Sequence, residues 1–138
     1  MSEATENTFQ FELVSPARKL SETPAYQVIV PGQDGEFGVR KGHASFVISM
    51  RAGVVEILKT EEAKPERIFV AGGFADISAE NCTVLAEEAV AVQDIDAVAV
   101  EEEITSLESH LVAEQDHAEQ KRLSHALHVA QAKLTACQ

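Results

Sequence analysis

The sequence predicts a mainly β protein with a helical end: an N-terminal antiparallel β-sandwich followed by a two-helix antiparallel hairpin. Two observations predict this division. All seven glycines and all four prolines lie before Gln93. Apolar residues repeat at period two before that point and at spacings of three and four after it. We therefore place a sandwich domain at residues 1–93 and a helical domain at residues 94–138.

Five segments of the first region have the character of β-strands. Apolar residues alternate along the first two, and β-branched residues dominate the other three, each bounded by glycine, proline, asparagine or charged residues. No helical pattern separates them, which favours antiparallel sheets packed as a sandwich or barrel. The segments are 9–13, 26–30, 53–58, 67–71 and 82–86, and a polar hairpin loop is expected at 60–66.

A glycine-rich segment, Pro31–His43, has the spacing Gly-x-x-Gly-x-x-Gly. It lacks the Gly-Lys-Ser/Thr ending of a phosphate-binding loop, and no helix follows it to receive a phosphate. We expect tight β-turns there.

Two apolar stripes predict the helices of the second region. Asp94 is the expected N-cap of the first helix, and Asp116 with Glu119 resembles a capping box for the second. The break lies between Val112 and His117, although one continuous helix remains an alternative because no Gly or Pro lies there. The stripes are Ala97, Val100, Ile104, Leu107 and Leu111, then Leu123, Leu127, Ala130, Leu134 and Cys137.

The formal net charge of −12 argues against nucleic acid and anionic lipid headgroups as direct partners. Residues 1–93 carry 14 acidic and 8 basic residues, 94–119 carry nine acidic and no basic ones, and 120–138 carry three basic and no acidic ones. Two interpretations stay open. In the first, the charges are solvated and support an antiparallel hairpin. In the second, the acidic and basic halves hold the hairpin closed so weakly that another acidic partner can take the place of the acidic half, which would make the hairpin a switch.

Candidate catalytic and metal-binding groups are sparse. Cys82 lies in an apolar run and Cys137 lies 55 residues later, and two such cysteines predict neither a zinc site nor a disulfide framework. His43 has no nucleophile in a suitable context, and His125 and His128 have no acidic residue beside them on their helix. We expect no metal site and no active site, so the chain is not expected to be an enzyme.

Several linked motifs, in order and spacing, resemble the epsilon subunit of F-type proton-translocating ATP synthases. The resemblance covers residues 8–96 closely and the rest by architecture. It implies a sandwich of about ten strands followed by a helical hairpin. The motifs are Phe11–Pro16, Val30–Val39, Gly42–Ala44, Gly53–Val54, Gly72–Ile77 and Asn81–Glu87.

The resemblance implies a non-catalytic rotor subunit of the central stalk. Such a subunit binds gamma and the ring of c subunits, and helps to couple proton-driven rotation to ATP synthesis. It implies a peripheral position on the cytoplasmic face of the bacterial inner membrane. Glu36 matches the position that faces the c ring, and Phe37, Arg40 and His43 flank it.

In this family the helical hairpin can also extend towards the catalytic head and restrain ATP hydrolysis. Basic residues of the second helix then contact an acidic segment of a catalytic subunit. The matching residues here are Lys121, Arg122 and Lys133, a small set that implies weak restraint.

Some relatives bind ATP through the motif Ile/Leu-Asp-x-x-Arg-Ala. Ile95 and Asp96 match its start, but Ala99 replaces the arginine and Val100 replaces the final alanine. Loss of the arginine removes a charge-assisted contact to phosphate, so we expect no cofactor and weak or no nucleotide binding. A nucleotide-sensing binding module remains the alternative function.

Overall fold

The computed structural model describes residues 7–138, which form two compact units, one ending at Ala91 and the other comprising Val92–Gln138. The expected domain boundary, between residues 93 and 94, lies in a short 3-10 helix, η1 (Val92–Asp94). None of the described helices is long and apolar enough to cross a membrane.

The first unit contains ten strands, and the predicted β-sandwich followed by two helices is confirmed. The five segments expected from sequence are β1, β3, β6, β7 and β9, with bounds that differ by no more than two residues. The strands are β1 (Phe9–Val14), β2 (Lys19–Ala25), β3 (Gln27–Gly32), β4 (Gly35–Arg40), β5 (Phe46–Met50), β6 (Gly53–Leu58), β7 (Glu66–Val70), β8 (Gly73–Ile77), β9 (Asn81–Ala86) and β10 (Ala89–Ala91).

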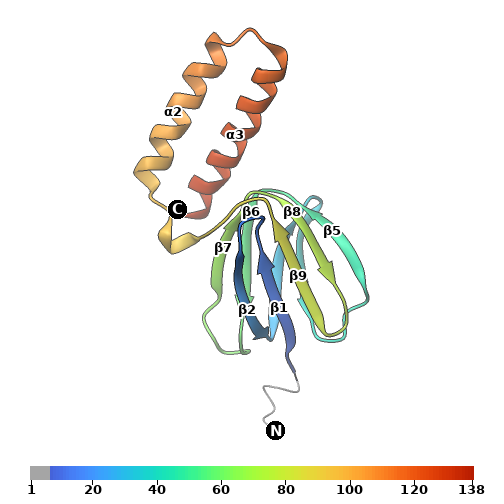
Figure 1. The fold of residues 1–138 in the computed structure, drawn as a ribbon. Coiled ribbons are helices and arrows are strands. Elements are labelled where there is room, and N and C mark those ends of the chain that lie inside the picture. The colour runs from blue at the N-terminus through green and yellow to red at the C-terminus, as the bar shows by residue number, and fades with distance from the viewer. Residues whose placement is uncertain (1–6) are drawn as a thin grey trace. The chain divides into compact units, whose positions relative to one another are not determined.

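The strands form two layers that are joined at one corner (Figure 1). One layer has the order β5-β8-β9-β1-β2, and the other has the order β10-β7-β6-β3-β4. A single pairing of β3 with β5, Gly32 with Met50, continues the hydrogen bonding from one layer to the other.

One strand pairing departs from the antiparallel expectation. β1 runs parallel to β9, whereas its pairing with β2 is antiparallel. Only a short hairpin forces two neighbouring strands to run in opposite directions. β1 and β9 are separated by most of the sandwich sequence, so nothing in their connection imposes that direction.

The core of the sandwich consists of the inward-facing residues of the alternating strands. Its side chains are aliphatic except for phenylalanine, methionine and one cysteine, which agrees with the low aromatic content. The largest fully buried side chains are Phe11, Phe69, Leu13, Ile57, Ile77, Val28, Val30, Val39, Val55, Val70 and Val84.

The glycine-rich segment contains more regular structure than expected. Turns occupy residues 33–34 and 41–42, but β4 lies between them and pairs with β3 along its whole length. The expectation of turns alone was wrong for Gly35–Arg40 because a two-residue turn brings this segment into hydrogen-bonding register with β3.

The second unit is a pair of antiparallel helices, α2 (Ala97–Ala113) and α3 (His117–Ala136), packed against each other. The chain breaks at residues 114–116, inside the predicted interval, and one continuous helix is excluded. Val100, Leu123 and Ala130 of the predicted stripes are buried, whereas Ala97 is exposed.

The N-cap of α2 is Asp96, not Asp94. One carboxylate oxygen of Asp96 accepts hydrogen bonds from the backbone N–H groups of Val98 (3.1 Å) and Ala99 (3.2 Å). Asp94 belongs to η1 and lies two residues before the N-cap position, too early to serve the first free N–H groups of α2.

Substitution of Gly73 tests the close approach of β8 to β9. Its φ is +129°, and an added Cβ would lie 2.0 Å from the carbonyl oxygen of Leu85. We expect Gly73→Ala to lower the free energy of unfolding, measured by urea denaturation, by about 2–6 kcal/mol, because backbone strain and overpacking add.

Gly35 provides the matched control, since its φ is +137° but an added Cβ meets no atom within 4 Å. Gly35→Ala should therefore cost only the strain, about 1–3 kcal/mol. Equal losses in the two variants would contradict the close approach at Gly73.

Candidate protein-docking sites

The pleat of β4 places Glu36 and Arg40 on its outer face. Glu36, Gly38 and Arg40 are exposed, whereas Val39 is buried. The three exposed residues line a shallow hollow of about 510 Å³, together with Gln27, Ile29 and His43. The structure thus brings Glu36, Arg40 and His43 to one surface, which we call the polar rim.

Phe37 lies on the opposite face of β4 and packs against the core. Its ring centroid is 5.2 Å from that of His43 and 4.9 Å from that of Phe46, and the His43 and Phe46 centroids are 5.1 Å apart. Phe37 therefore contributes to the polar rim indirectly, by packing its ring against that of His43.

Two contacts orient Arg40. Its Nε donates a hydrogen bond to Oε1 of Gln27 at 2.8 Å, and its guanidinium carbon lies 5.0 Å from the centroid of the Tyr26 ring. A cation held between an amide and an aromatic face keeps one position at low entropic cost. The terminal nitrogens of Arg40 are thus presented at a defined place beside the hollow.

A second surface, the apolar face, was not identified from the sequence. Phe74 of β8 lies directly opposite Leu85 of β9, and Val47 lies on the adjacent strand β5. These side chains are 53%, 49% and 62% exposed, respectively. The adjacent pair of Phe74 and Leu85, with Val47 on the next strand, makes this face a candidate protein-binding surface.

The residues that match the start of the nucleotide motif have a structural role. Asp96 uses one carboxylate oxygen for the two capping bonds to α2 described above. Ile95 precedes it and is half-buried. No cation lies at position 99, where alanine donates its backbone N–H to Asp96.

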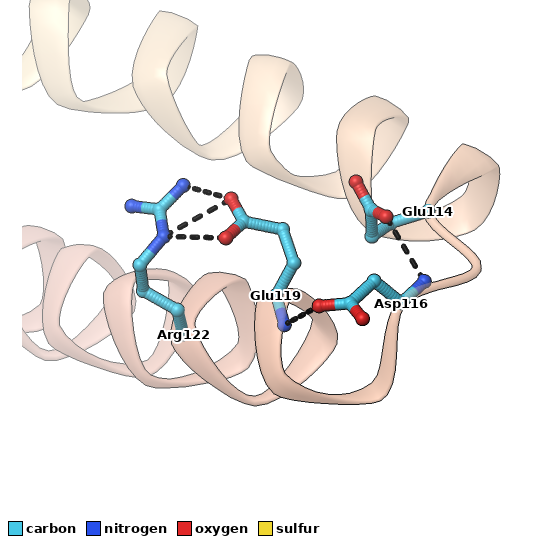
Figure 2. A network of polar contacts seen from close by, with 4 residues as sticks. All are labelled: Glu114, Asp116, Glu119 and Arg122. Carbon is cyan, nitrogen blue, oxygen red and sulfur yellow. Dashed lines mark hydrogen bonds and ion pairs between the residues drawn. The ribbon is translucent and has the colours of Figure 1, made fainter.

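The turn between α2 and α3 carries a network of carboxylates (Figure 2). Oδ2 of Asp116 accepts a hydrogen bond from the Glu119 backbone N–H at 3.0 Å, and the Asp116 backbone N–H donates to Oε1 of Glu114 at 3.0 Å. Both oxygens of the Glu119 carboxylate accept from Nε of Arg122 at 3.0 Å, and Oε1 also accepts from a terminal nitrogen of Arg122.

This network shifts two titrations in the direction expected of an ion pair. The hydrogen bond from Arg122 lowers the pKa of Glu119, and Glu119 in turn raises the pKa of Arg122, with a further contribution from the charge of Glu114. The ion pair stabilises the helical hairpin when the pH is above the ordinary pKa of glutamate. This stabilisation is lost as the pH falls through the lowered pKa of Glu119.

The three predicted basic residues do not form one cluster. Lys121 and Arg122 are exposed in the second turn of α3. Lys133 is half-buried in the last turn, where the helix dipole stabilises a positive charge. Arg122 is already paired with Glu119. Only Lys121 and Arg122 therefore lie in the same turn of α3.

The described residues contain no group of three or more histidine, cysteine or acidic residues arranged to hold a metal ion. Burial, with a further contribution from the charge of Asp76, raises the pKa of the Cys82 thiol to about 12, so its reactive thiolate is suppressed at neutral pH. The described part of the chain thus presents a polar hollow and an exposed apolar face on the sandwich, which are candidate docking surfaces, and a charged hairpin turn.

Comparison with known proteins gives a consistent result. The family model described as "ATP synthase, Delta/Epsilon chain, beta-sandwich domain" matches residues 8–92. The ATP synthase epsilon chain of Rhodospirillum centenum is 40% identical over 129 residues, which cover 91% of this chain and 88% of the relative. That of Rhodospirillum rubrum is 38% identical and covers 94% and 96%, respectively.

Solved structures share the fold at low identity. A chain of the Euglena gracilis mitochondrial ATP synthase, in a structure of its OSCP, F1 and c-ring parts, has a TM-score of 0.81 at 21% identity, over 95% of this chain and 82% of that one. A chain from the central stalk and c ring of the Tetrahymena thermophila enzyme has a TM-score of 0.62 at 8% identity, over 94% and 96%.

The family match and the identity to relatives over most of their length agree with the sandwich and the helical pair described above. The chain therefore belongs to the ATP synthase epsilon-chain family and is an accessory rather than a catalytic subunit.

Proposed function

We propose that this chain is a rotor subunit of the central stalk, joining gamma to the c ring so that proton-driven rotation is coupled to ATP synthesis. Its location would be peripheral, on the cytoplasmic face of the bacterial inner membrane. The observation that carries the proposal is the presence, on one sandwich, of two surfaces of different chemistry. A subunit that joins two partners needs two such surfaces.

The apolar face suits gamma. Long-lived interfaces exclude charged residues from their centre and bury aromatic and aliphatic side chains. Phe74 and Leu85 form a cross-strand pair on this face. Val47 lies diagonally from Phe74 and directly opposite the exposed Asp76, which marks the polar edge of the face. We assign the face to gamma because rotor subunits that turn together need a stable contact.

The polar rim suits the polar loops of the c ring. Glu36 supplies a carboxylate and Arg40 a guanidinium whose position is fixed by Gln27 and Tyr26. Such charges give orientation and register more than affinity. Glu36, Arg40 and His43 would make this contact, with Phe37 holding His43 in place.

The helical hairpin would restrain ATP hydrolysis by offering Lys121 and Arg122, and to a smaller extent Lys133, to an acidic segment of a catalytic subunit. The separation of acidic and basic charge between the two halves of the hairpin supports this role. The small number of cations makes the restraint weak.

ATP sensing is the rival function, and we propose that this chain does not perform it. Asp96 is used as a helix cap and alanine stands at position 99.

Charge placed on the apolar face tests the assignment to gamma. Phe74→Glu should lower the affinity for gamma at least about 30-fold, because aromatic anchors at interface centres contribute 2 kcal/mol or more. Co-purification of the full chain with gamma measures this. Thr60→Glu, in the exposed loop after β6, adds the same charge away from the face and should bind normally. Wild-type recovery of gamma by Phe74→Glu would reject the assignment.

Removal of the cations tests the restraint. In an enzyme reconstituted with the full chain, Lys121→Ala with Arg122→Ala should raise ATP hydrolysis by about twofold to tenfold, since each exposed pair contributes roughly 0–1 kcal/mol. Lys59→Ala with Lys64→Ala removes two cations from the sandwich unit and should leave hydrolysis unchanged. Deletion of residues 94–138 should raise hydrolysis further while leaving assembly intact. Unchanged hydrolysis in all variants would favour solvated charges without a regulatory role.

Titration of the full chain with ATP, followed calorimetrically, tests the absence of nucleotide sensing. We expect no saturable binding at micromolar ATP, because no fixed cation stands at position 99. Submicromolar affinity would restore the sensing module as the better function.

A further inference from the structure

The turn between α2 and α3 contains half of the expected capping box. In a complete box, the N-cap side chain accepts from the backbone N–H three residues on, and the side chain there reaches back to the N-cap backbone N–H. Asp116 makes the first bond, to the Glu119 N–H. The second bond is absent, because the Asp116 N–H donates to Glu114 instead.

Because the Asp116 N–H donates to Glu114, the Glu119 carboxylate is left to pair with another group. Figure 2 shows its carboxylate turned away from the Asp116 N–H and towards Arg122, one turn further along α3. The carboxyl group of Glu114 occupies the position that Glu119 takes in a complete box. Glu114 is itself fixed, since its carbonyl oxygen accepts from Nε2 of Gln120 at 2.7 Å and its backbone N–H donates to the carbonyl of His110 at 3.0 Å.

We propose that Glu119 competes with the acidic segment of the catalytic subunit for Arg122, and that Glu114 maintains this competition by holding the Asp116 backbone N–H. The inference rests on the proposed restraint of hydrolysis and adds its regulation. Arg122 can bind an acidic segment of a catalytic subunit only after it leaves Glu119. The hairpin turn therefore weakens its own restraint.

The competition has a modest size. The pair is solvent-exposed and separated by three residues on one helix, so its loss should strengthen binding by Arg122 only about twofold to fivefold. Two substitutions should free Arg122 and so strengthen its binding to the acidic segment. Glu119→Gln removes the competing charge, and Glu114→Ala allows Glu119 to return to the Asp116 N–H.

A double-mutant cycle separates this mechanism from general repulsion between acidic residues. ATP hydrolysis is measured in enzyme reconstituted with the full chain. Glu119→Gln should lower hydrolysis about twofold to fivefold when Arg122 is present and have no effect in an Arg122→Ala background. Glu114→Ala should also lower it. An equal fall in both backgrounds, or no fall with Arg122 present, would overturn the inference.

Glu102→Gln is the matched control. It removes one negative charge from an exposed position of α2, 12 residues before Glu114. That separation corresponds to about 18 Å along a helix. Hydrolysis should equal that of the wild type, and a fall like that of Glu119→Gln would indicate simple repulsion.

The contact itself is measured independently by nuclear magnetic resonance on the isolated full chain. The Arg122 Nε–H should exchange slowly with water in the wild type, and faster in Glu119→Gln and in Glu114→Ala, while Glu102→Gln should match the wild type. If Glu114→Ala leaves the exchange slow, the role of Glu114 is wrong.

The two levels of failure are distinguishable. If deletion of residues 94–138 leaves hydrolysis unchanged, the proposed restraint fails and the regulatory inference fails with it. If that deletion raises hydrolysis but Glu119→Gln does not lower it, only the inference fails.

Discussion

The pleat of the sandwich strands is the constraint on which both proposed docking surfaces depend. Successive side chains of a strand point to opposite faces, so burial of one set fixes the exposure of the other. On β8, Ala75 and Ile77 are fully buried, which leaves Phe74 facing solvent. On β4, burial of Val39 does the same for Arg40. A register shift of one residue would bury Arg40 and expose the core.

The two surfaces differ because their outward residues differ, while the core behind them is uniformly apolar. The outward positions of β4 carry Glu36, Gly38 and Arg40, so its outer face is hollow and polar. Phe74 and Leu85 meet across β8 and β9, so that face is apolar. The apolar core holds each set of side chains at a fixed spacing, which is the property that the proposed rotor role needs.

The helical hairpin has a different physical basis. Few of its residues are buried, and its ends depend on side-chain caps by Asp96 and Asp116. Such a unit is held by weak exposed interactions, each of which can be exchanged for a contact with a partner. The pairing of Glu119 with Arg122 is one of these, and in the proposed restraint of hydrolysis it would set how readily Arg122 reaches a partner.

Much of the fold could be predicted from local patterns, and the failures have identifiable causes. Gly53–Leu58 shows its strand character in β-branched residues, whereas β4 contains two glycines and becomes a strand only because β3 pairs with it. Asp94 and Asp96 are chemically equal as caps, and the chain path after β10 decides between them.

The surfaces were less accessible to sequence reasoning. Glu36, Arg40 and His43 were identified through resemblance, and their meeting at one hollow requires the pairing of β3 with β4. The apolar face joins β5, β8 and β9, and their adjacency is not visible in the sequence, although the alternation in Gly73–Ile77 does place Phe74 outward. The proposed competition for Arg122 rests on the hydrogen bond from the Asp116 backbone N–H to Glu114, which is not visible in the sequence.

The central claim is that one sandwich joins two partners through two separate surfaces. Photo-crosslinking in the assembled enzyme tests it most directly, with a photoreactive phenylalanine analogue placed at position 36 or 74 and the products identified by mass spectrometry. Position 74 should crosslink to gamma and position 36 to a c subunit. Crosslinking of both positions to the same subunit, or with the partners reversed, would contradict the account.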